Sequence, residues 1–469
     1  MTATGETIGE RMSGEAKTAA IQNLGCSKNQ IDGERVMALF ASNGYDITEE
    51  FFLADTIVVN TCAFIREAQE EAIDTVLEMA ALRKAGRCRT LIVSGCFSER
   101  YRDKVKRDFP EVDVWVGVND WEAVISSLIQ KNSLTDNSCD TASTLPSSPR
   151  NTFIAADFKR ILSEPVSTQH IKIAEGCSHK CTFCVIPSIR GKFRSRSEES
   201  IIQEAKWLYE QGVRELILVA QDTTFYGRDI KTNLARLLES LLKNTKFPWI
   251  RMMYLYPQLI GSDLLKLIAS EPRLCPYFDI PLQHISDTIL TAMNRSPLSG
   301  GIRQLIDTIR DTVDNVTLRT SFIIGFPGET AKEFDELCRF VQSTRFDKLG
   351  VFPFSPEEGT PAHSMRPRPR AVTVQMRCDE LMDIQQEISR EILENKVGNQ
   401  VQVIIDRISD DPDFSYEGRT MGDAPEIDGR AFIQAGKFEI GDIVAGKIIG
   451  AGDYDIYVDT QTSRRRDKI

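Results

Sequence analysis

The fold of this chain is constrained most by an alternation of short apolar segments with amphipathic helical segments. Between residues 19 and 131, the apolar segments are AAIQNLGC, DTIVVNTC, TLIVSGC and VDVWVGV, and helical patterns alternate with them. Alternating strands and helices form a parallel sheet with helices on both faces. We therefore predict an amino-terminal α/β domain with a parallel sheet over residues 19–131.

A second alternation fills residues 153–396. Six strand candidates occur there, separated by helical patterns: HIKIA, ELILVA, WIRMMY, YFDIPL, LRTSFIIGF and KLGVFPF. A complete barrel of this type has eight strand–helix units. The six units of this chain therefore predict a partial (β/α)6 barrel within an α/β protein.

The remaining segments differ in pattern. Residues 397–461 contain short strands at turn-rich spacing, which predict a small antiparallel β-barrel. Residues 132–152 carry nine Ser or Thr and two Pro, as in a linker. We expect residues 1–18 to form a flexible tail and residues 462–469 a basic tail. The apolar segments are too short to span a membrane, and the first residues lack the apolar core of a signal peptide, so we expect a cytoplasmic protein.

Cysteine content and charge limit the function. Eleven cysteines in a chain without secretory features favour metal or redox chemistry, and we expect no disulfide partner. The net charge of −11 argues against a partner bound mainly through its phosphates. Residues 397–460 hold thirteen Asp or Glu against five Lys or Arg, which favours a basic partner.

Three cysteines form a C-x3-C-x2-C array just after the first barrel strand, where such barrels place their active sites. They are Cys177, Cys181 and Cys184. A tetrahedral zinc ion or a 4Fe–4S cluster needs four ligands. Three thiols around a cluster would leave one iron open to a small molecule. The alternatives are a structural zinc with a distant fourth ligand, such as Cys275 or His284, or three unpaired thiols.

Three other cysteines end apolar strands of the first domain, in QNLGC, VVNTC and VSGC. They are Cys26, Cys62 and Cys96. Because the carboxyl ends of parallel strands share one edge of a sheet, these thiols can meet there and hold a second metal centre. Buried cysteines without a ligand are the alternative. We predict no role for Cys88, Cys139, Cys275, Cys338 and Cys378.

Polar residues end several barrel strands. Gln221 and Asp222 follow the second strand as candidates for ligand or substrate contacts, although Asp222 could instead cap a helix. Gln283 and His284 end the fourth strand. Arg319 could hold a carboxylate or form an outward salt bridge. Gly325 begins the turn GFPGE, which permits close approach to a ligand or is simply a tight turn.

The motif CSHKCTFC resembles the signature of the radical S-adenosylmethionine superfamily. This resemblance implies that S-adenosylmethionine is the fourth ligand of a 4Fe–4S cluster and that Phe183 lies near its adenine. The turn at Gly325 also resembles the ribose- and adenine-contacting turn of that superfamily. From their places on the barrel strands, Gln221, Gln283 and Arg319 are further candidate cofactor-binding residues, and Asp222 is the candidate catalytic residue.

From about residue 19 to residue 460 the chain resembles the methylthiotransferases, which add a TRAM domain after the barrel. The motifs NLGCSKNQIDGE, NTCAFIREAQEEAID, VAQDTTFYG, DIPLQHISD and FSPEEGTPA are similar to those of the ribosomal-protein aspartate methylthiotransferases. The resemblance implies methylthiolation of the β-carbon of an aspartate in ribosomal small-subunit protein twelve, free or in the assembled subunit. It implies two 4Fe–4S clusters and two S-adenosylmethionine molecules.

The electron is expected from a donor such as flavodoxin or ferredoxin. Two alternatives stay open: a tRNA adenosine methylthiotransferase with the same chemistry, and a non-enzymatic, zinc-dependent ribosome adaptor. The acidic carboxy-terminal barrel favours a basic protein over tRNA as the substrate.

Overall fold

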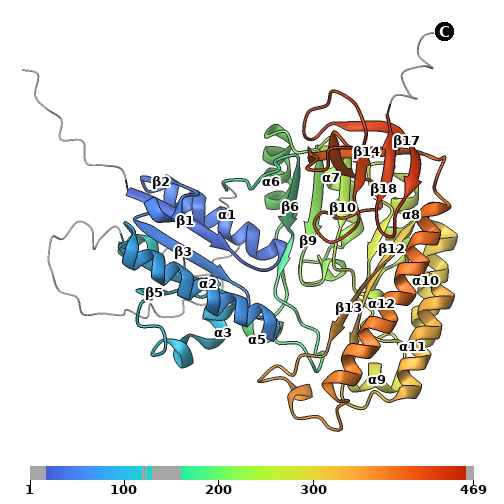
Figure 1. The fold of residues 1–469 in the computed structure, drawn as a ribbon, viewed down its shortest axis with the longest axis horizontal. Coiled ribbons are helices and arrows are strands. Elements are labelled where there is room, and N and C mark those ends of the chain that lie inside the picture. Colours follow the sequence, from blue (N-terminus) through green and yellow to red (C-terminus); the bar gives the residue numbers. More distant parts are fainter. Residues whose placement is uncertain (1–16, 119–120, 122–123, 129–159, 461–469) are drawn as a thin grey trace, which may run out of the picture. The chain divides into compact units, whose positions relative to one another are not determined.

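The structure, a computed structural model, describes residues 17–118, 121, 124–128 and 160–460, and it divides into two compact units (Figure 1). The first unit comprises residues 1–63 and 68–153, and the second comprises residues 64–67 and 154–469. The predicted linker 132–152 and basic tail 462–469 lie outside the described residues. The first strand begins at Lys17, inside the segment that we expected to be a tail.

The first unit contains a parallel sheet, as predicted; it has five strands in the order β2-β1-β3-β4-β5. The strands are β1 (Lys17–Asn23), β2 (Tyr45–Ile47), β3 (Thr56–Thr61), β4 (Thr90–Gly95) and β5 (Val114–Trp115). Every residue of β3 is buried, so both faces of the sheet are covered. The helices are α1 (Ser27–Ser42), α2 (Arg66–Ala85) and α3 (Cys96–Val105). The short strand β2 and the polar helix α3 were not predicted.

The second unit begins with the six predicted barrel strands. They are β6 (Thr168–Lys172), β9 (Glu215–Val219), β10 (Trp249–Met252), β11 (Tyr277–Asp279), β12 (Thr317–Ile324) and β13 (Lys348–Pro353). Two parallel sheets, β10-β9-β6 and β11-β12-β13, are joined by a single bridge between Ile250 and Leu274. The order of the strands therefore follows the chain, as in a partial (β/α)6 barrel.

Helices surround these strands. They are α6 (Glu198–Glu210), α7 (Leu234–Asn244), α8 (Ser262–Ser270), α9 (Asp287–Ala292), α10 (Ser299–Thr312), α11 (Ala331–Thr344) and α12 (Ala371–Glu394). Figure 1 shows α11 and α12 side by side on one flank of the barrel. Leucine, isoleucine and phenylalanine side chains of strands and helices form one continuous core. No helix in the described part of the chain is both long and apolar enough to cross a bilayer.

The carboxy-terminal strands form a closed barrel in the order β14-β15-β16-β18-β17. They are β14 (Gln400–Ile408), β15 (Tyr416–Arg419), β16 (Ala431–Ile433), β17 (Ile443–Ala451) and β18 (Ile456–Asp459). The predicted antiparallel arrangement is wrong at one pairing, because β16 and β18 run parallel. The reason is that β17 lies between them in sequence but pairs with β14 and β18, so β18 returns in the direction of β16.

Ion pairs attach this small barrel to the amino ends of the larger barrel's strands. Arg419 Nη1 lies 2.8 Å from Glu215 Oε2, and Lys348 Nζ lies 2.7 Å from Asp423 Oδ1. The Tyr277 hydroxyl donates to Asp428 at 2.6 Å. Glu215, Tyr277 and Lys348 are the first residues of their strands. The small barrel therefore docks at the end opposite to the cysteine array.

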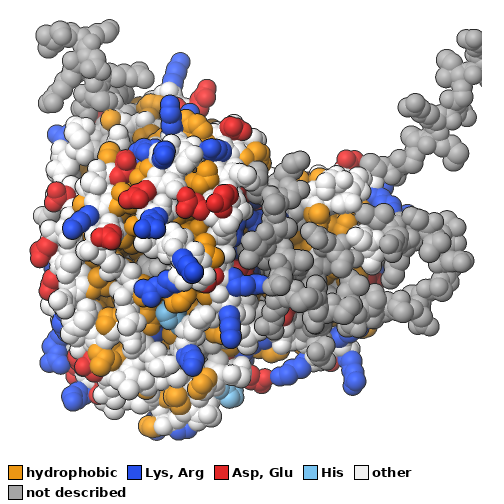
Figure 2. Space-filling view, turned by 180° about the vertical axis from the view of Figure 1, so that it is seen from behind, with side chains coloured by type: hydrophobic (Ala, Val, Ile, Leu, Met, Phe, Trp, Pro, Cys, Tyr) orange, Lys and Arg blue, Asp and Glu red, His pale blue; other side chains and the backbone are white. Residues whose placement is uncertain are grey.

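Surface charge on one face is mixed. Figure 2, the view from behind, shows acidic, basic and apolar side chains intermingled over the part of that face that the structure describes. A mixed surface of this kind does not indicate a phosphate-rich partner there.

Candidate active site

The C-x3-C-x2-C array lies in a loop at the carboxyl end of β6, as predicted. The two-residue strands β7 (Ala174–Glu175) and β8 (Arg194–Ser195) pair on either side of this loop and hold its ends together. Gly176 has φ +79°, and a Cβ there would lie 2.4 Å from the Lys192 carbonyl oxygen. The Cys177 amide donates to the Gly191 carbonyl at 3.0 Å. Glycine is therefore required for the close approach that turns the chain into the cysteine loop.

The three thiols of the loop are partly buried. Burial is the main cause that raises the pKa to about 11 for Cys177 and to about 12 for Cys184. Asp222 and Cys181 add smaller contributions at Cys177, and Cys181 does so at Cys184. Bound metal reverses this preference because a coordinating thiol is deprotonated. Three adjacent thiols on one loop fit the soft-ligand set of an iron–sulfur cluster. In the described residues, no three His, Cys, Asp or Glu side chains are grouped as ligands of one metal ion.

A buried ionic network lies beside the loop. Glu175 Oε2 lies 2.9 Å from Lys172 Nζ and 3.2 Å from Arg190 Nη1. Burial alone would raise the pKa of Glu175, but the two cations outweigh burial and lower that pKa to about 2. Gln221 Nε2 donates to Glu175 Oε1 at 2.9 Å. Gln221 Oε1 is buried and has no hydrogen-bond partner among the described residues, so it is available to a donor on a ligand.

Asp222 is buried and caps the short helix η3 (Thr223–Phe225), which is the alternative that the sequence left open. Its Oδ1 accepts from the Phe225 amide at 3.1 Å and from the Thr224 hydroxyl at 2.5 Å. Its Oδ2 lies 2.6 Å from His179 Nε2. The His179 ring stacks on Tyr256 with centroids 3.9 Å apart. His179 is a spacer between two cysteines in the sequence, and nothing there indicated this pairing.

The fourth and fifth strands end in a second group of predicted residues. Gln283 has φ +73°, and its backbone bridges to Phe322. Gly325 has φ +82°, and a Cβ there would lie 2.5 Å from the Val374 side chain of α12. The Gly325 amide donates to Glu329 Oε2 at 2.9 Å. The turn is therefore held by a contact within the chain.

His284 and Phe183 contact this same region. His284 is fully buried, with Nδ1 accepting from the Ser286 amide at 3.0 Å and Nε2 3.6 Å from Glu329 Oε2. The structure therefore places His284 beside Glu329. Phe183 packs against an apolar cluster that includes Phe326 and Ala362.

Arg319 is not brought to the cysteine loop. It lies five residues before the end of β12, and its Nη1 donates to Asp279 Oδ1 at 2.8 Å. Its Nε lies 3.5 Å from Asp428 of the small barrel. These contacts correspond to the salt-bridge alternative that the sequence left open.

Cys26, Cys62 and Cys96 follow β1, β3 and β4, which are neighbours in the sheet of the first unit. A Cβ on Gly25 would lie 2.6 Å from the Cys62 Cβ, so the segments that carry Cys26 and Cys62 are in contact. Asn29 Nδ2 joins the ends of β1 and β3 by donating to the Leu24 and Thr61 carbonyls at 2.8 and 3.0 Å. The Thr61 hydroxyl donates to the Ser94 carbonyl at 2.5 Å. The three strand ends are thus fastened to one another.

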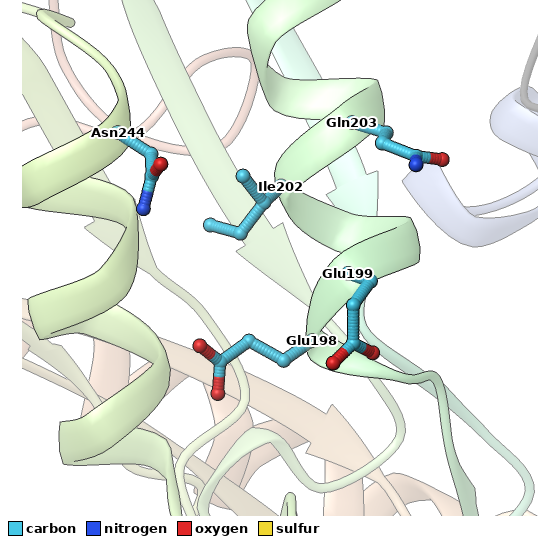
Figure 3. A pocket seen from close by; sticks show the side chains of 5 residues that line it. All are labelled: Glu198, Glu199, Ile202, Gln203 and Asn244. Atoms are coloured by element: carbon cyan, nitrogen blue, oxygen red, sulfur yellow. The ribbon is translucent and has the colours of Figure 1, made fainter.

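The other described cysteines are buried at separate places. They are Cys88, Cys275, Cys338 and Cys378, and burial raises the pKa of each. Cys139 lies outside the described residues. A surface hollow between α6 and α7 contains none of the predicted site residues (Figure 3). It is lined by Glu198, Glu199, Ile202, Gln203 and Asn244.

Three family models match successive parts of the chain. The uncharacterized protein family UPF0004 matches residues 18–117, the radical SAM superfamily matches residues 171–341, and the TRAM domain matches residues 397–460. Radical SAM chemistry uses an iron–sulfur cluster and S-adenosylmethionine.

Curated relatives cover almost the whole chain. "Ribosomal protein uS12 methylthiotransferase RimO" of Pelobacter propionicus is 41% identical over 95% of this chain and 98% of its own. The protein of that name in Syntrophus aciditrophicus is 43% identical over 94% of this chain and 98% of its own.

Among solved structures, the radical S-adenosylmethionine methyltransferase TsrM of Kitasatospora setae, with cobalamin and a [4Fe-4S] cluster bound, matches with a TM-score of 0.55. The identity is 13%, and the match covers 74% of this chain and 77% of that one. At this identity the similarity concerns the fold.

Proposed function

The chain belongs to the family of ribosomal protein uS12 methylthiotransferases, and on this basis we propose that it methylthiolates the β-carbon of an aspartate in ribosomal small-subunit protein twelve. It is a transferase of the radical S-adenosylmethionine type. The observation that carries the proposal is the loop of three partly buried thiols at the carboxyl end of β6, the end at which barrels of this kind bind their substrates.

Cys177, Cys181 and Cys184 would hold a 4Fe–4S cluster whose fourth iron binds S-adenosylmethionine. Such a cluster would supply the one-electron reduction of S-adenosylmethionine that yields a radical able to remove a hydrogen from the substrate, with the electron coming from a donor such as flavodoxin or ferredoxin. The chain's part is to position the reactants and exclude water. Acid–base groups alone do not activate an aspartate β-carbon, so a radical is needed.

Four residues around the loop are proposed to bind S-adenosylmethionine. The unpaired Gln221 Oε1 can accept from its amino group, and the proposal extends to Gln283, Phe183 and the turn at Gly325. Arg319 was expected to join them. Its ion pairs with Asp279 and Asp428 support instead a role in joining the two barrels. Asp222, paired with His179, is the proposed catalytic residue.

Cys26, Cys62 and Cys96 are proposed to hold a second 4Fe–4S cluster at the edge of the first unit's sheet. Their positions after three adjacent strands, with the strand ends bonded to one another, support this assignment. A second S-adenosylmethionine would supply the methyl group, and a sulfur atom held at this second cluster would supply the sulfur. Measuring the iron content tests the number of clusters. Replacing these three cysteines with serine should remove about half of the iron and leave the other cluster intact. Cys88→Ser, in the same unit, is the matched control and should retain all the iron.

Docking of the basic substrate protein is proposed to use the small barrel. At least five of its thirteen acidic residues are already paired with cations of this chain, namely Asp406, Glu417, Asp423, Asp428 and Asp453. The hairpin between β14 and β15 instead exposes Asp410, Asp411 and Asp413. Replacing these three with Lys should slow association at low salt by about tenfold or more. Glu426→Lys in another loop is the control, and equal binding by the hairpin variant would contradict this docking surface.

The reaction is tested by one anaerobic assay of the reconstituted protein with S-adenosylmethionine and a reductant. Protein twelve, the assembled small subunit and bulk tRNA are offered separately and analysed by mass spectrometry. A methylthio mass gain on an aspartate of protein twelve is the expected result. A gain on tRNA would transfer the proposal to the tRNA branch. Zinc without labile sulfide, and no cleavage of S-adenosylmethionine, would favour a non-enzymatic adaptor.

A further inference from the structure

Arg295 lies against the cysteine loop without belonging to it. This residue follows α9, and its Nη1 lies 3.7 Å from Cys181 Sγ in a hydrogen bond to sulfur. Its Nη2 donates to the Pro281 carbonyl at 2.5 Å. The two terminal nitrogens of one guanidinium therefore contact a thiol of the array and a fixed backbone oxygen, which orients the positive charge toward Cys181.

Tyr256 holds this guanidinium in place. Arg295 Cζ lies 4.3 Å from the centroid of the Tyr256 ring, a distance typical of a cation–π contact. The His179 ring is stacked 3.9 Å from the same centroid. The Tyr256 ring is therefore in contact with both His179 and Arg295. The Tyr256 hydroxyl also accepts from the Ser296 amide at 3.3 Å, which fixes the ring to the segment that carries Arg295.

These contacts form a closed ring of interactions that begins and ends at the cysteine loop. His179 and Cys181 belong to the same loop, His179 stacks on Tyr256, Tyr256 supports Arg295, and Arg295 donates to Cys181. A side chain needed only to close the loop would not require a charged donor aimed at sulfur. Hydrogen bonds and charges near the sulfur ligands are a main means by which proteins set the reduction potential of an iron–sulfur cluster.

We propose that Arg295 is a positioning residue that raises the reduction potential of the cluster bound by Cys177, Cys181 and Cys184. Reduction adds one negative charge to the cluster, and a cationic donor on Cys181 stabilises that added charge. The inference rests on the proposed function, because it requires a cluster at this loop. Its consequence is that a donor of moderate potential can reduce this cluster. Without Arg295 a stronger reductant is needed.

The test is a redox titration of the full-length, reconstituted protein followed by electron paramagnetic resonance. The relevant cluster is identified by the change in its spectrum when S-adenosylmethionine is added. Arg295→Met should lower the equilibrium constant for reduction by about tenfold, which corresponds to about 59 mV for one electron. Arg295→Lys should lie between Arg295→Met and the unchanged protein. Arg303 of α10, whose Cζ lies 4.7 Å from the centroid of the Phe340 ring of α11, is the matched cation–π arginine, and Arg303→Met should leave the potential unchanged.

Each possible result distinguishes an effect of Arg295 on the reduction potential from a purely structural role. An unchanged midpoint in Arg295→Met with full iron content would overturn the inference. If Arg295→Met fails to hold iron, Arg295→Gln keeps a donor without the charge and should still show a lowered midpoint. Loss of iron in all three Arg295 variants, with Arg303→Met intact, would assign Arg295 a purely structural role. If the unchanged protein forms no cluster that responds to S-adenosylmethionine, the proposed function itself fails.

Discussion

The two ends of the larger barrel both carry buried charged residues that are paired within the chain, as Glu175 is with Lys172 and Arg190 at the carboxyl end, but they differ in what lies beside those pairs. At the amino end, Glu215, Arg251 and Arg419 neutralise one another within the chain. At the carboxyl end, the Gln221 amide keeps an unpaired acceptor beside three thiols that have no disulfide. The comparison shows that a charged residue at a strand end does not by itself indicate a ligand site. What distinguishes the site is an unused acceptor that lies beside three thiols of one loop.

The amino end should give the largest loss of stability when one partner is removed. Arg251 is fully buried, with Nε 2.7 Å from Glu215 and Nη1 2.9 Å from the Met421 carbonyl of the small barrel. Arg251→Met leaves a buried carboxylate with one cation fewer, so the free energy of unfolding should fall by about 3–5 kcal/mol. Denaturant unfolding at pH 7 measures this loss.

Arg430→Met is the control for this change. Like Arg251, Arg430 pairs with a glutamate, in this case Glu417 of the small barrel, but 54% of the Arg430 side chain is exposed. The expected loss is about 0–1 kcal/mol. Equal losses in the two variants would mean that burial does not distinguish these ion pairs.

Asp423 should make the stability of the contact between the two barrels depend on pH. Burial alone would raise its pKa, but Lys348 at 2.7 Å and the Thr420 hydroxyl outweigh burial, and the pKa of Asp423 is lowered. A carboxyl with a lowered folded pKa stabilises the fold above its unfolded value of about 4 and loses that contribution as pH falls through the folded pKa. Asp423→Asn should cost about 1.5–3 kcal/mol at pH 7.

The difference in free energy of unfolding between Asp423→Asn and the unchanged protein should be constant from pH 7 to about pH 5. It should become smaller below about pH 4. Measuring the difference is essential, because burial raises the pKa of the nearby Asp406 and Asp428, whose effects on stability have the opposite sign. Free energies of unfolding of both proteins, measured at several pH values, give this difference. A difference that does not narrow in acid would exclude the Asp423 carboxylate as the source.

Replacing Gly325 tests whether the turn at the carboxyl end needs glycine for ligand binding or for packing within the chain. Its φ of +82° and the 2.5 Å approach to Val374 both penalise a Cβ. Gly325→Ala should therefore lower the free energy of unfolding by about 1–3 kcal/mol even without a ligand. Val374→Ala should relieve part of the clash, so the double variant should lose less than the sum of the single variants. Strict additivity would show that α12 does not restrict this turn.

Most of the strands and the places of both cysteine groups could be predicted from the sequence. Apolar runs marked the strands, and parallel topology fixes which strand ends share an edge. The helix α3 was missed because it is mainly polar. The ion pair of Arg319 with Asp428 joins two residues that are 109 positions apart and belong to different barrels, so no local pattern indicates it. The pairing of His179 with Asp222 depends on the conformation of the loop, which spacing alone does not specify.

Asp222 should give the smallest loss of stability among these changes and the clearest loss of activity. Asp222→Asn keeps an oxygen for the helix cap, so the free energy of unfolding should fall by about 1 kcal/mol or less. The variant replaces the carboxylate that lies 2.6 Å from His179. Methylthio product should fall by about tenfold or more if this carboxylate acts on the substrate or its protons.

Asp229 provides the matched control, because its carboxylate also accepts from a backbone amide and a hydroxyl, both of Ser195, at 2.8 and 2.6 Å. Asp229→Asn should cost a similar amount of stability and leave the product yield per loaded cluster unchanged. Equal yields from the two variants would reduce Asp222 to a helix cap, and the carboxyl end would then act through its thiols and Gln221.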